Sequence, residues 1–222
     1  KPSNAPRSIL STPLPIVTLV NDAQPANADV SKAVTESGMT ILSRLLQFEN
    51  AFSPIFVTEL PIFTFTAFNS CRNLVSLKLG NSVTVIGDEV FESCRSLTSV
   101  NFPDSLTTIG DGAFSSCKGL TVVKIPDSVI SIGNGAFDGC DGLTSLKIGK
   151  SVSAIGAAAF RDCEGLAVVE IPGSVESIGG GVNQGAFMCC GLTRVSIGKG
   201  VKTIAPWAFW ACYSLEDVAI PD

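Results

Sequence analysis

The apolar and polar positions of this chain follow one pattern, seen most clearly in residues 143–164, LTSLKIGKSVSAIGAAAFRDCE. At its start, Leu146 and Ile148 alternate with residue types that are usually exposed, which is the period-2 signal of a half-buried strand. A second, shorter extended segment follows, and its Val152 and Ile155 are expected to point inward. The pattern therefore predicts two short strands in close succession.

A turn and a third element complete the unit. Gly149–Ser151 supplies the turn between the two strands, and Gly156 relieves the backbone at the next corner. Ala159, Phe160 and Cys163 then fit one face of a short helical turn, because Phe and Cys stand three residues apart. Each unit is thus expected to hold two strands and a helical turn.

This unit recurs along most of the chain with a period of 23 residues. Cysteine, phenylalanine, leucine and an Ile-Gly pair all keep that period. The positions are Cys71, Cys94, Cys117, Cys140 and Cys163; Phe68, Phe91, Phe114, Phe137 and Phe160; Leu74, Leu97, Leu120, Leu143 and Leu166; and Ile86, Ile109, Ile132, Ile155 and Ile178. One coil cannot bury its own apolar side, so the coils must stack into a solenoid with like residues above one another.

The period breaks once. Phe187 follows Phe160 by 27 residues, because GGGVNQGA at 179–186 adds four, and the period is restored at Leu215. An insertion in a solenoid loops out on one face, often the binding face. The alternative is a neutral surface loop.

The repeat consensus L-x-x-V/L-x-I-P/G-x-S-V-x-x-I-G-x-x-A-F-x-x-C-x-x-L resembles that of the BspA-type leucine-rich repeats. Four repeats match it nearly word for word, as in residues 120–143, and the resemblance covers roughly three quarters of the chain. It implies an α/β repeat solenoid, curved and used for binding, often in surface proteins of bacteria and protists. The N-terminal segment lies outside the resemblance.

Two regions are therefore expected. Residues 1–54 are interpreted as an extended arm, which includes a short strand at 16–20, followed by a helical N-terminal cap at about 29–48; a helix that docks on a partner is the alternative to a cap. Residues 55–222 are interpreted as a solenoid of about seven coils, the last truncated. A fragment, an end covered by a partner, and an end tolerated because its strand is short would each explain that truncation.

Composition and charge limit the classes of function that this chain can have. With 45% hydrophobic and 16% charged residues, the chain can build a continuous core, and its net charge of −5 makes a nucleic-acid role unexpected. No apolar run approaches the ~20 residues that span a bilayer. Lys1 in place of an initial Met fits either a processed or a truncated start, and a processed start would mean that a targeting segment has been removed. The resemblance favours an extracellular or cell-surface location, and an organelle or assembly-bound location stays open.

Six of the eight cysteines occupy one place in successive coils. We interpret them as a ladder of buried free thiols that act as small hydrophobic residues, although stacked Cα atoms ~5 Å apart would permit a disulfide by distance. No C-x-x-C pair is present, so no metal site is expected. At Cys189-Cys190, one cysteine fills the ladder and the other is expected to be exposed and reactive.

Catalysis is not expected. The chain has no histidine, which removes Ser-His-Asp and Cys-His nucleophiles and His-ligated metals. The carboxylates are scattered through turns, with no pair spaced for acid–base work. Gly179–Gly181 does not lie between a strand and a helix, so it is not a phosphate loop. No cofactor is expected.

Three surface features are the candidates for protein binding. The first is the exposed face of the long strands, with Lys78, Asn101, Lys124, Lys147 and Glu170 in one row and Arg194 in the next; its alternative is a solvated sheet face. The second is the insertion, with Asn183 and Gln184. The third is the aromatic cluster of Trp207, Trp210 and Tyr213, residue types enriched in interfaces, which either caps the last coil or is covered by a partner.

Two functions fit these features. The first is non-catalytic protein–protein binding or a scaffold role, as a surface adhesin or ligand-binding protein. The second is a structural subunit of a larger assembly, which docks through the N-terminal arm and the C-terminal aromatic residues. A glycan-binding module fits less well, because the strand face has small polar residues and few aromatic rings for stacking.

Overall fold

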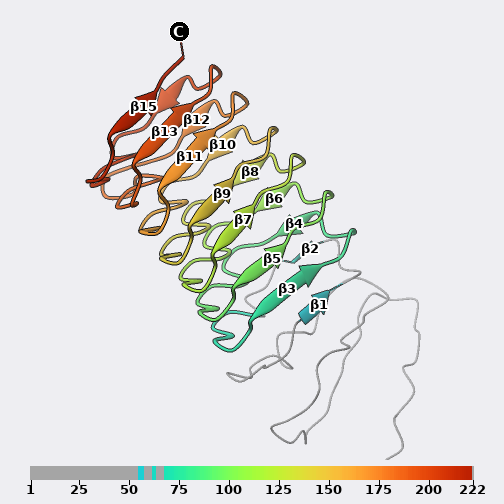
Figure 1. Ribbon diagram of the computed structural model, residues 1–222. Helices are drawn as coiled ribbons and strands as arrows, with labels where there is room; N and C mark the ends of the chain where they lie inside the picture. The colour runs from blue at the N-terminus through green and yellow to red at the C-terminus, as the bar shows by residue number, and fades with distance from the viewer. Residues whose placement is uncertain (1–54, 58–61, 64–67, 222) are drawn as a thin grey trace, which may run out of the picture.

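The computed structural model describes residues 55–57, 62–63 and 68–221. They form an elongated stack of coils, in which longer and shorter strands alternate along the chain (Figure 1). The longer strands are β1 (Ile55–Val57), β3 (Ser76–Leu79), β5 (Ser99–Asn101), β7 (Val122–Lys124), β9 (Ser145–Lys147), β11 (Val168–Ile171), β13 (Arg194–Ile197) and β15 (Asp217–Ala219). The shorter strands are β2 (Ile62–Phe63), β4 (Val85–Ile86), β6 (Thr108–Ile109), β8 (Ser131–Ile132), β10 (Ala154–Ile155), β12 (Ser177–Ile178) and β14 (Thr203–Ile204). The two predicted strands per coil are confirmed.

Each coil has three sides, and the strands form two of them. The longer strands make parallel sheets in the orders β1-β3-β5-β7-β9 and β11-β13-β15, and the shorter strands make one parallel sheet from β2 to β14. Equivalent residues lie opposite each other, as Lys124 does with Lys147 and Ile109 with Ile132. Residues 23 positions apart in the sequence therefore lie side by side in neighbouring strands.

The third side is a series of turns, and here the prediction of a helical turn is wrong: the described residues contain no helix. Ala158 and Asp162 have φ of 53° and 56°, in the left-handed region, which a right-handed helix cannot pass through. The Phe160 N–H donates to the Ala186 carbonyl of the next coil at 2.7 Å, while the Arg161 N–H donates to the Ala158 carbonyl within the turn at 3.1 Å. Successive N–H groups are thus bonded alternately between coils and within β-turns.

The solenoid in the described region is therefore a β-solenoid rather than the expected α/β one. The predicted helical cap at 29–48 and the arm before it lie outside the described residues.

The core runs through the middle of the stack as two ladders. The phenylalanine rings at 68, 91, 114, 137, 160, 187 and 209 stack on one another with centroids 5.1–5.5 Å apart. Beside them, the cysteines at 71, 94, 117, 140, 163, 190 and 212 are buried and free, which confirms the thiol ladder. Both ladders follow from stacking identical coils, since each side chain then meets its own kind.

The insertion leaves this core undisturbed. The Ala186 N–H donates to the Gly179 carbonyl at 3.1 Å, which closes the loop at its base. The Ala186 carbonyl then takes the Phe160 N–H as its equivalents do in other coils, and Val182 at the tip is 79% exposed. The extra residues are thus looped out.

Candidate protein-binding surface

The exposed side of the longer strands, here called the strand face, carries the first group of predicted residues. Lys78 lies opposite Asn101, and Lys124 lies opposite Lys147, at equivalent places in paired strands. Their side chains are exposed, because residues in a strand alternate between the core and solvent. The structure therefore brings these four into one row across β3, β5, β7 and β9.

The same face continues onto β11 and β13 with a different charge. Glu170 pairs with Ser196 in register and is exposed. Arg194 lies in the neighbouring row, opposite Asp217, and its Nε is 2.8 Å from Asp217 Oδ2. Because Arg194 is already paired within the chain, it is less available to a partner than the lysines of the first sheet.

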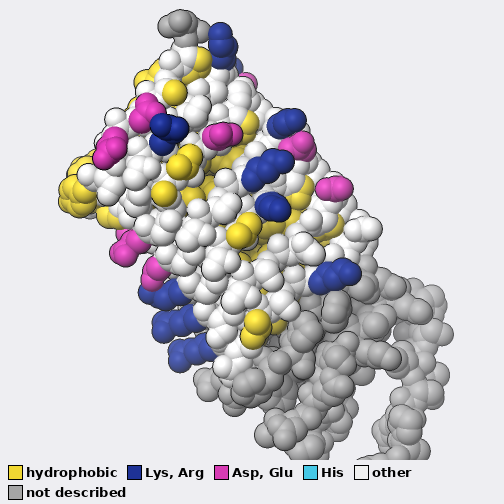
Figure 2. All heavy atoms as spheres, viewed as in Figure 1, with side chains coloured by type: hydrophobic (Ala, Val, Ile, Leu, Met, Phe, Trp, Pro, Cys, Tyr) yellow, Lys and Arg dark blue, Asp and Glu magenta, His cyan; other side chains and the backbone are white. Residues whose placement is uncertain are grey.

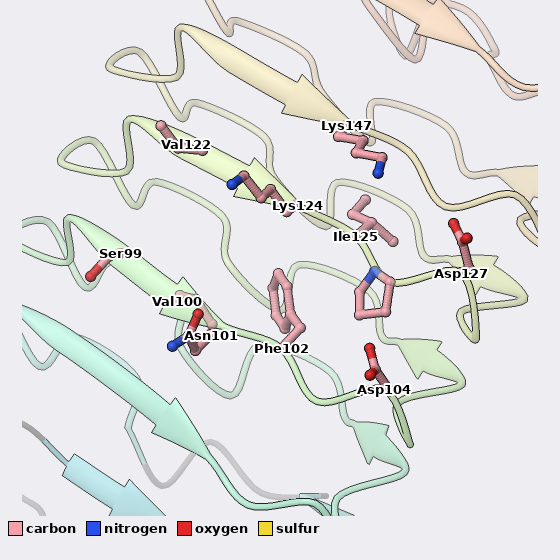
Figure 3. Close-up of a pocket in the computed structure, with 11 residues that line it drawn as sticks. Ser99, Val100, Asn101, Phe102, Asp104, Val122, Lys124, Ile125, Asp127 and Lys147 are labelled. Atoms are coloured by element: carbon pink, nitrogen blue, oxygen red, sulfur yellow. The ribbon is translucent and has the colours of Figure 1, made fainter.

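A groove of about 500 Å³ opens on the strand face between β5 and β9. Its apolar lining comes from Val100, Phe102, Val122, Ile125 and Pro126, and its polar lining from Ser99, Asn101, Asp104, Lys124, Asp127 and Lys147 (Figure 3). The volume is in the usual range of ligand pockets, but the lining is more polar than in most such sites, because six of its eleven residues are polar or charged. The groove includes three of the predicted residues: Asn101, Lys124 and Lys147.

Local loss of strand pairing accompanies the groove. The register of β5 and β7 is limited to Ser99↔Val122, whereas β7 and β9 pair from Val122 to Lys124. At the end of β5 stands Phe102, where other coils have a smaller aliphatic residue such as Ile125. Its ring is only partly buried and meets Phe114 edge-on, with centroids 5.6 Å apart. The ring of Phe102 thus lines the opening at the place where the pairing of β5 with β7 is reduced.

Charge is divided along this groove. Lys124 and Lys147 stand on β7 and β9, while Asp104 and Asp127 lie beyond the ends of β5 and β7, with Phe102 between the strands (Figure 3). Both lysines, Asp104 and Asp127 are exposed. The groove thus offers a cationic part, an apolar floor and an anionic part, a combination that can receive a peptide with both charges.

The second and third predicted features lie together, away from the strand face. Asn183 and Gln184 are exposed in the insertion, between β12 and the turn side. A side chain at Gly185 would collide with the Trp207 carbonyl of the next coil, so the insertion rests directly on the backbone of the aromatic segment. The insertion and the aromatic segment, which are separate in the sequence, therefore form one surface region in the structure.

The aromatic cluster is largely open to solvent. Trp207 and Trp210 are 36% and 46% exposed, and Tyr213 is 92% exposed. The two indole rings lie 5.1 Å apart and are tilted by 50°. Trp207 also has a φ of 68°, which is unusual for a bulky residue. That these rings either cap the last coil or are covered by a partner stays a prediction, because the structure holds the chain alone.

Cys189 differs from the expected reactive thiol. Cys190 fills the ladder, and Cys189 is half-buried beside it. Partial burial raises the pKa of the Cys189 thiol, and the negative charge of Asp162 raises this pKa further. A raised pKa lowers the thiolate fraction near neutral pH, whereas a reactive thiol needs a lowered one.

Sequence reasoning missed Val100, Phe102 and Pro126, which shape the groove. The available signal was Phe102 itself, an aromatic residue in a row that otherwise holds Leu79, Ile125, Ile148, Ile171 and Ile197.

No helix among residues 68–221 and the described strand residues before them could cross a membrane. No group of acidic residues or thiols in the same part of the chain could hold a metal ion.

Comparison with known proteins agrees with this architecture. The model of the BspA type leucine-rich repeat region matches residues 62–184 and 131–222, with six copies. The chain resembles the crystal structure of a leucine-rich-repeat protein from T. pallidum, at 27% identity and a TM-score of 0.58, over 75% of this chain and 68% of that one. A search of curated proteins gave no significant match.

A second solved structure is similar at lower scores. It is a leucine-rich cell-surface protein from Faecalibacterium prausnitzii, with 22% identity and a TM-score of 0.43, over 73% of this chain and 64% of that one. The family match covers well over half of the sequence, and families of this repeat type are typically non-catalytic and suggest protein binding or a surface-protein role. This chain belongs to the BspA type leucine-rich-repeat family.

Proposed function

We propose that this chain is a non-catalytic protein-binding module, and that the groove on its strand face receives an extended segment of a partner protein. The observation that carries the proposal is the opening between β5 and β7, where Phe102 and Ile125 line the groove and the strand pairing is reduced. A surface adhesin or ligand-binding protein would use such a site for recognition.

The chemistry of the groove defines the partner segment. Lys124 and Lys147 would face a carboxylate of the segment, the floor at Phe102 would take an apolar side chain, and Asp104 would face a cationic one. Rigid stacked coils hold these groups in place before binding, which lowers the entropic cost of association. Affinity would come mainly from the apolar contact, and the charges would fix the direction of the segment.

A peptide library displayed on phage tests this proposal. Peptides selected on the whole chain are measured by fluorescence anisotropy against Lys124→Glu and against a matched control, Lys150→Glu. Both lysines are exposed and both changes alter the net charge equally, but only Lys124 lines the groove. We expect Lys124→Glu to weaken binding about tenfold or more, as for one charge-paired contact in an interface, and Lys150→Glu to leave it unchanged.

Phe102→Ile is the second test of the same site, because it replaces the ring with the side chain of the other coils. We expect the peptides to lose most of their affinity for this variant. Equal binding by wild type, Lys124→Glu and Phe102→Ile would exclude the groove as the recognition site.

The alternative function, a subunit of a larger assembly, is supported by the exposed rings of Trp207, Trp210 and Tyr213. Such rings are frequent at the centres of interfaces. Cross-linking in the native source distinguishes the two functions: cross-links from residues 206–213 to one partner in fixed stoichiometry support the assembly, and cross-links from the strand face support the binding module.

A further inference from the structure

Five charged residues follow the cysteine ladder, one per coil, along the corner that leads from the turn side to the longer strands. They are Arg72, Arg95, Lys118, Asp141 and Glu164, and we call them the charged edge. The first three are basic and the last two acidic. Figure 2 shows such a column of basic side chains continued by acidic ones along one edge of the solenoid.

Backbone packing holds these corners in register. A side chain at Gly142 would collide with the Lys118 carbonyl, and one at Gly165 would lie 2.9 Å from the Asp141 carbonyl. The Gly165 N–H donates to that same Asp141 carbonyl at 3.1 Å. Neighbouring charges along the edge are therefore one coil apart, about the 5 Å that separates adjacent strands.

Among the described residues, the charges of this edge are only partly neutralised. Lys118 Nζ lies 2.7 Å from Asp141 Oδ2, where the sign changes. Arg72, Arg95 and Glu164 have no ion-pair partner within the part of the chain that the structure describes. Among the described residues, two cations without such a partner therefore stand on one side of the central pair and one anion on the other.

A partner must match both the order of signs and their spacing. An extended peptide places side chains of one face about 7 Å apart, twice the rise of a strand residue, so it falls out of step with coils about 5 Å apart. A second copy of this chain has the same spacing. When it runs antiparallel, its acidic residues meet the basic ones, and a two-fold axis makes the contact self-complementary.

We propose that the charged edge is a contact between two antiparallel copies of this chain, with the two-fold axis between Lys118 and Asp141. Arg95 then faces Glu164 of the second copy, and Lys118 faces Asp141 of the second copy. The two central ion pairs combine into an alternating group of four charges. The contact is independent of the groove, which lies on the strand face.

This association is weak and depends on salt. Exposed ion pairs contribute little each, and about 1 M salt reduces the screening length to about 3 Å. We expect dimers of the whole chain at low ionic strength, measured by sedimentation velocity, and monomers at about 1 M salt.

Charge reversal at Arg95 and Glu164 tests the orientation. In Arg95→Glu the edge would place two acidic residues opposite each other, and in Glu164→Arg two basic ones. We expect each variant alone to dissociate about tenfold more readily than wild type, because two symmetric contacts change sign. Mixed in equal amounts, the two variants should form a heterodimer. The two substituted positions then face each other with opposite charges, and the unchanged Glu164 of one copy faces the unchanged Arg95 of the other.

Asp104→Arg is the matched control, because Asp104 is an exposed residue of the same coil as Arg95 but lies at the other end of β5. It should self-associate like wild type. Association restored by mixing Arg95→Glu with Asp104→Arg, instead of with Glu164→Arg, would overturn the proposal in favour of packing between strand faces. A monomeric wild type at low salt would also overturn it. Circular dichroism of each variant shows that the fold is kept.

Discussion

At the scale of single residues, the cysteine ladder has a hydrogen-bonding reason as well as a packing one. The Phe114 carbonyl accepts the Cys117 N–H at 3.2 Å within its own turn and the Cys140 thiol of the next coil at 3.3 Å. A carbonyl has two lone pairs, and both are used. The same arrangement recurs at Cys94, Cys163 and Cys212. A cysteine is thus both small enough for the core and able to donate, which alanine is not.

The ladder thiols make stability depend on alkaline pH. Burial raises the pKa of the Cys140 thiol from 9.0 to about 12. The unfolded chain therefore loses this proton near pH 9 while the folded chain keeps it until about pH 12. The stabilisation is complete below pH 9, and between these values the free energy of unfolding falls by about 1.4 kcal/mol per pH unit for this thiol.

Urea unfolding of wild type and Cys140→Ser between pH 8 and pH 11 measures this effect. Serine does not titrate in this range, and the lysines and other thiols contribute equally to both proteins. We expect the stability difference between them to be constant below about pH 9 and to shrink above it by about 1.4 kcal/mol per pH unit. A difference that stays constant to pH 11 would contradict the raised pKa.

At the scale of elements, the turn side explains why the helical prediction failed. Phe160 and Cys163 are three residues apart, a spacing that a helical turn and a pair of successive β-turns share. What separates the two is a left-handed residue, and Ala158 and Asp162 occupy these positions although neither is glycine. The equivalent positions in the preceding coil are Gly135 and Gly139, also with positive φ. The glycines were the available signal.

The left-handed positions predict opposite effects for one substitution at two adjacent residues. Ser116 has a φ of 59° and Ser115 does not have a positive φ. We expect Ser116→Gly to raise the free energy of unfolding by about 0.5–1 kcal/mol, because glycine removes the left-handed strain, and Ser115→Gly to lower it by a similar amount. Thermal or urea unfolding of the two variants checks this. Destabilisation by both would mean that position 116 is not strained.

The strands, their order in each coil and the core ladders could be predicted, because each repeat has the same order of apolar and polar residues. Stacking equivalent residues on one another then allows only one strand register. The groove could not. It depends on how far the sheet opens around Phe102, which is a balance between ring packing on Phe114 and the pairing of β5 with β7. The sequence shows that a larger side chain stands at position 102. It does not show whether the ring packing or the strand pairing is lost as a result.

At the scale of the whole molecule, the chain is a one-dimensional stack, because each coil contacts its neighbours. The Phe137 ring is fully buried between Phe114 and Phe160, with both centroid distances 5.3 Å. Phe209 is only partly buried, and within the described residues it stacks on Phe187 alone, at 5.5 Å. The same residue type should therefore contribute differently in the middle of the stack and in the last coil.

Alanine substitutions at these two rings test this one-dimensional coupling. Phe137→Ala opens a cavity that two coils share, so we expect it to lower the free energy of unfolding by about 3–5 kcal/mol. Because the coils before and after it are coupled through the coil of Phe137, the urea transition should also become broader, with a lower apparent m-value. Phe209→Ala should lower the free energy by less than half as much and leave the slope unchanged, since the remaining stack keeps its contacts. Equal losses with equal slopes would mean that the molecule unfolds as one cooperative unit, in which the position of a coil does not matter.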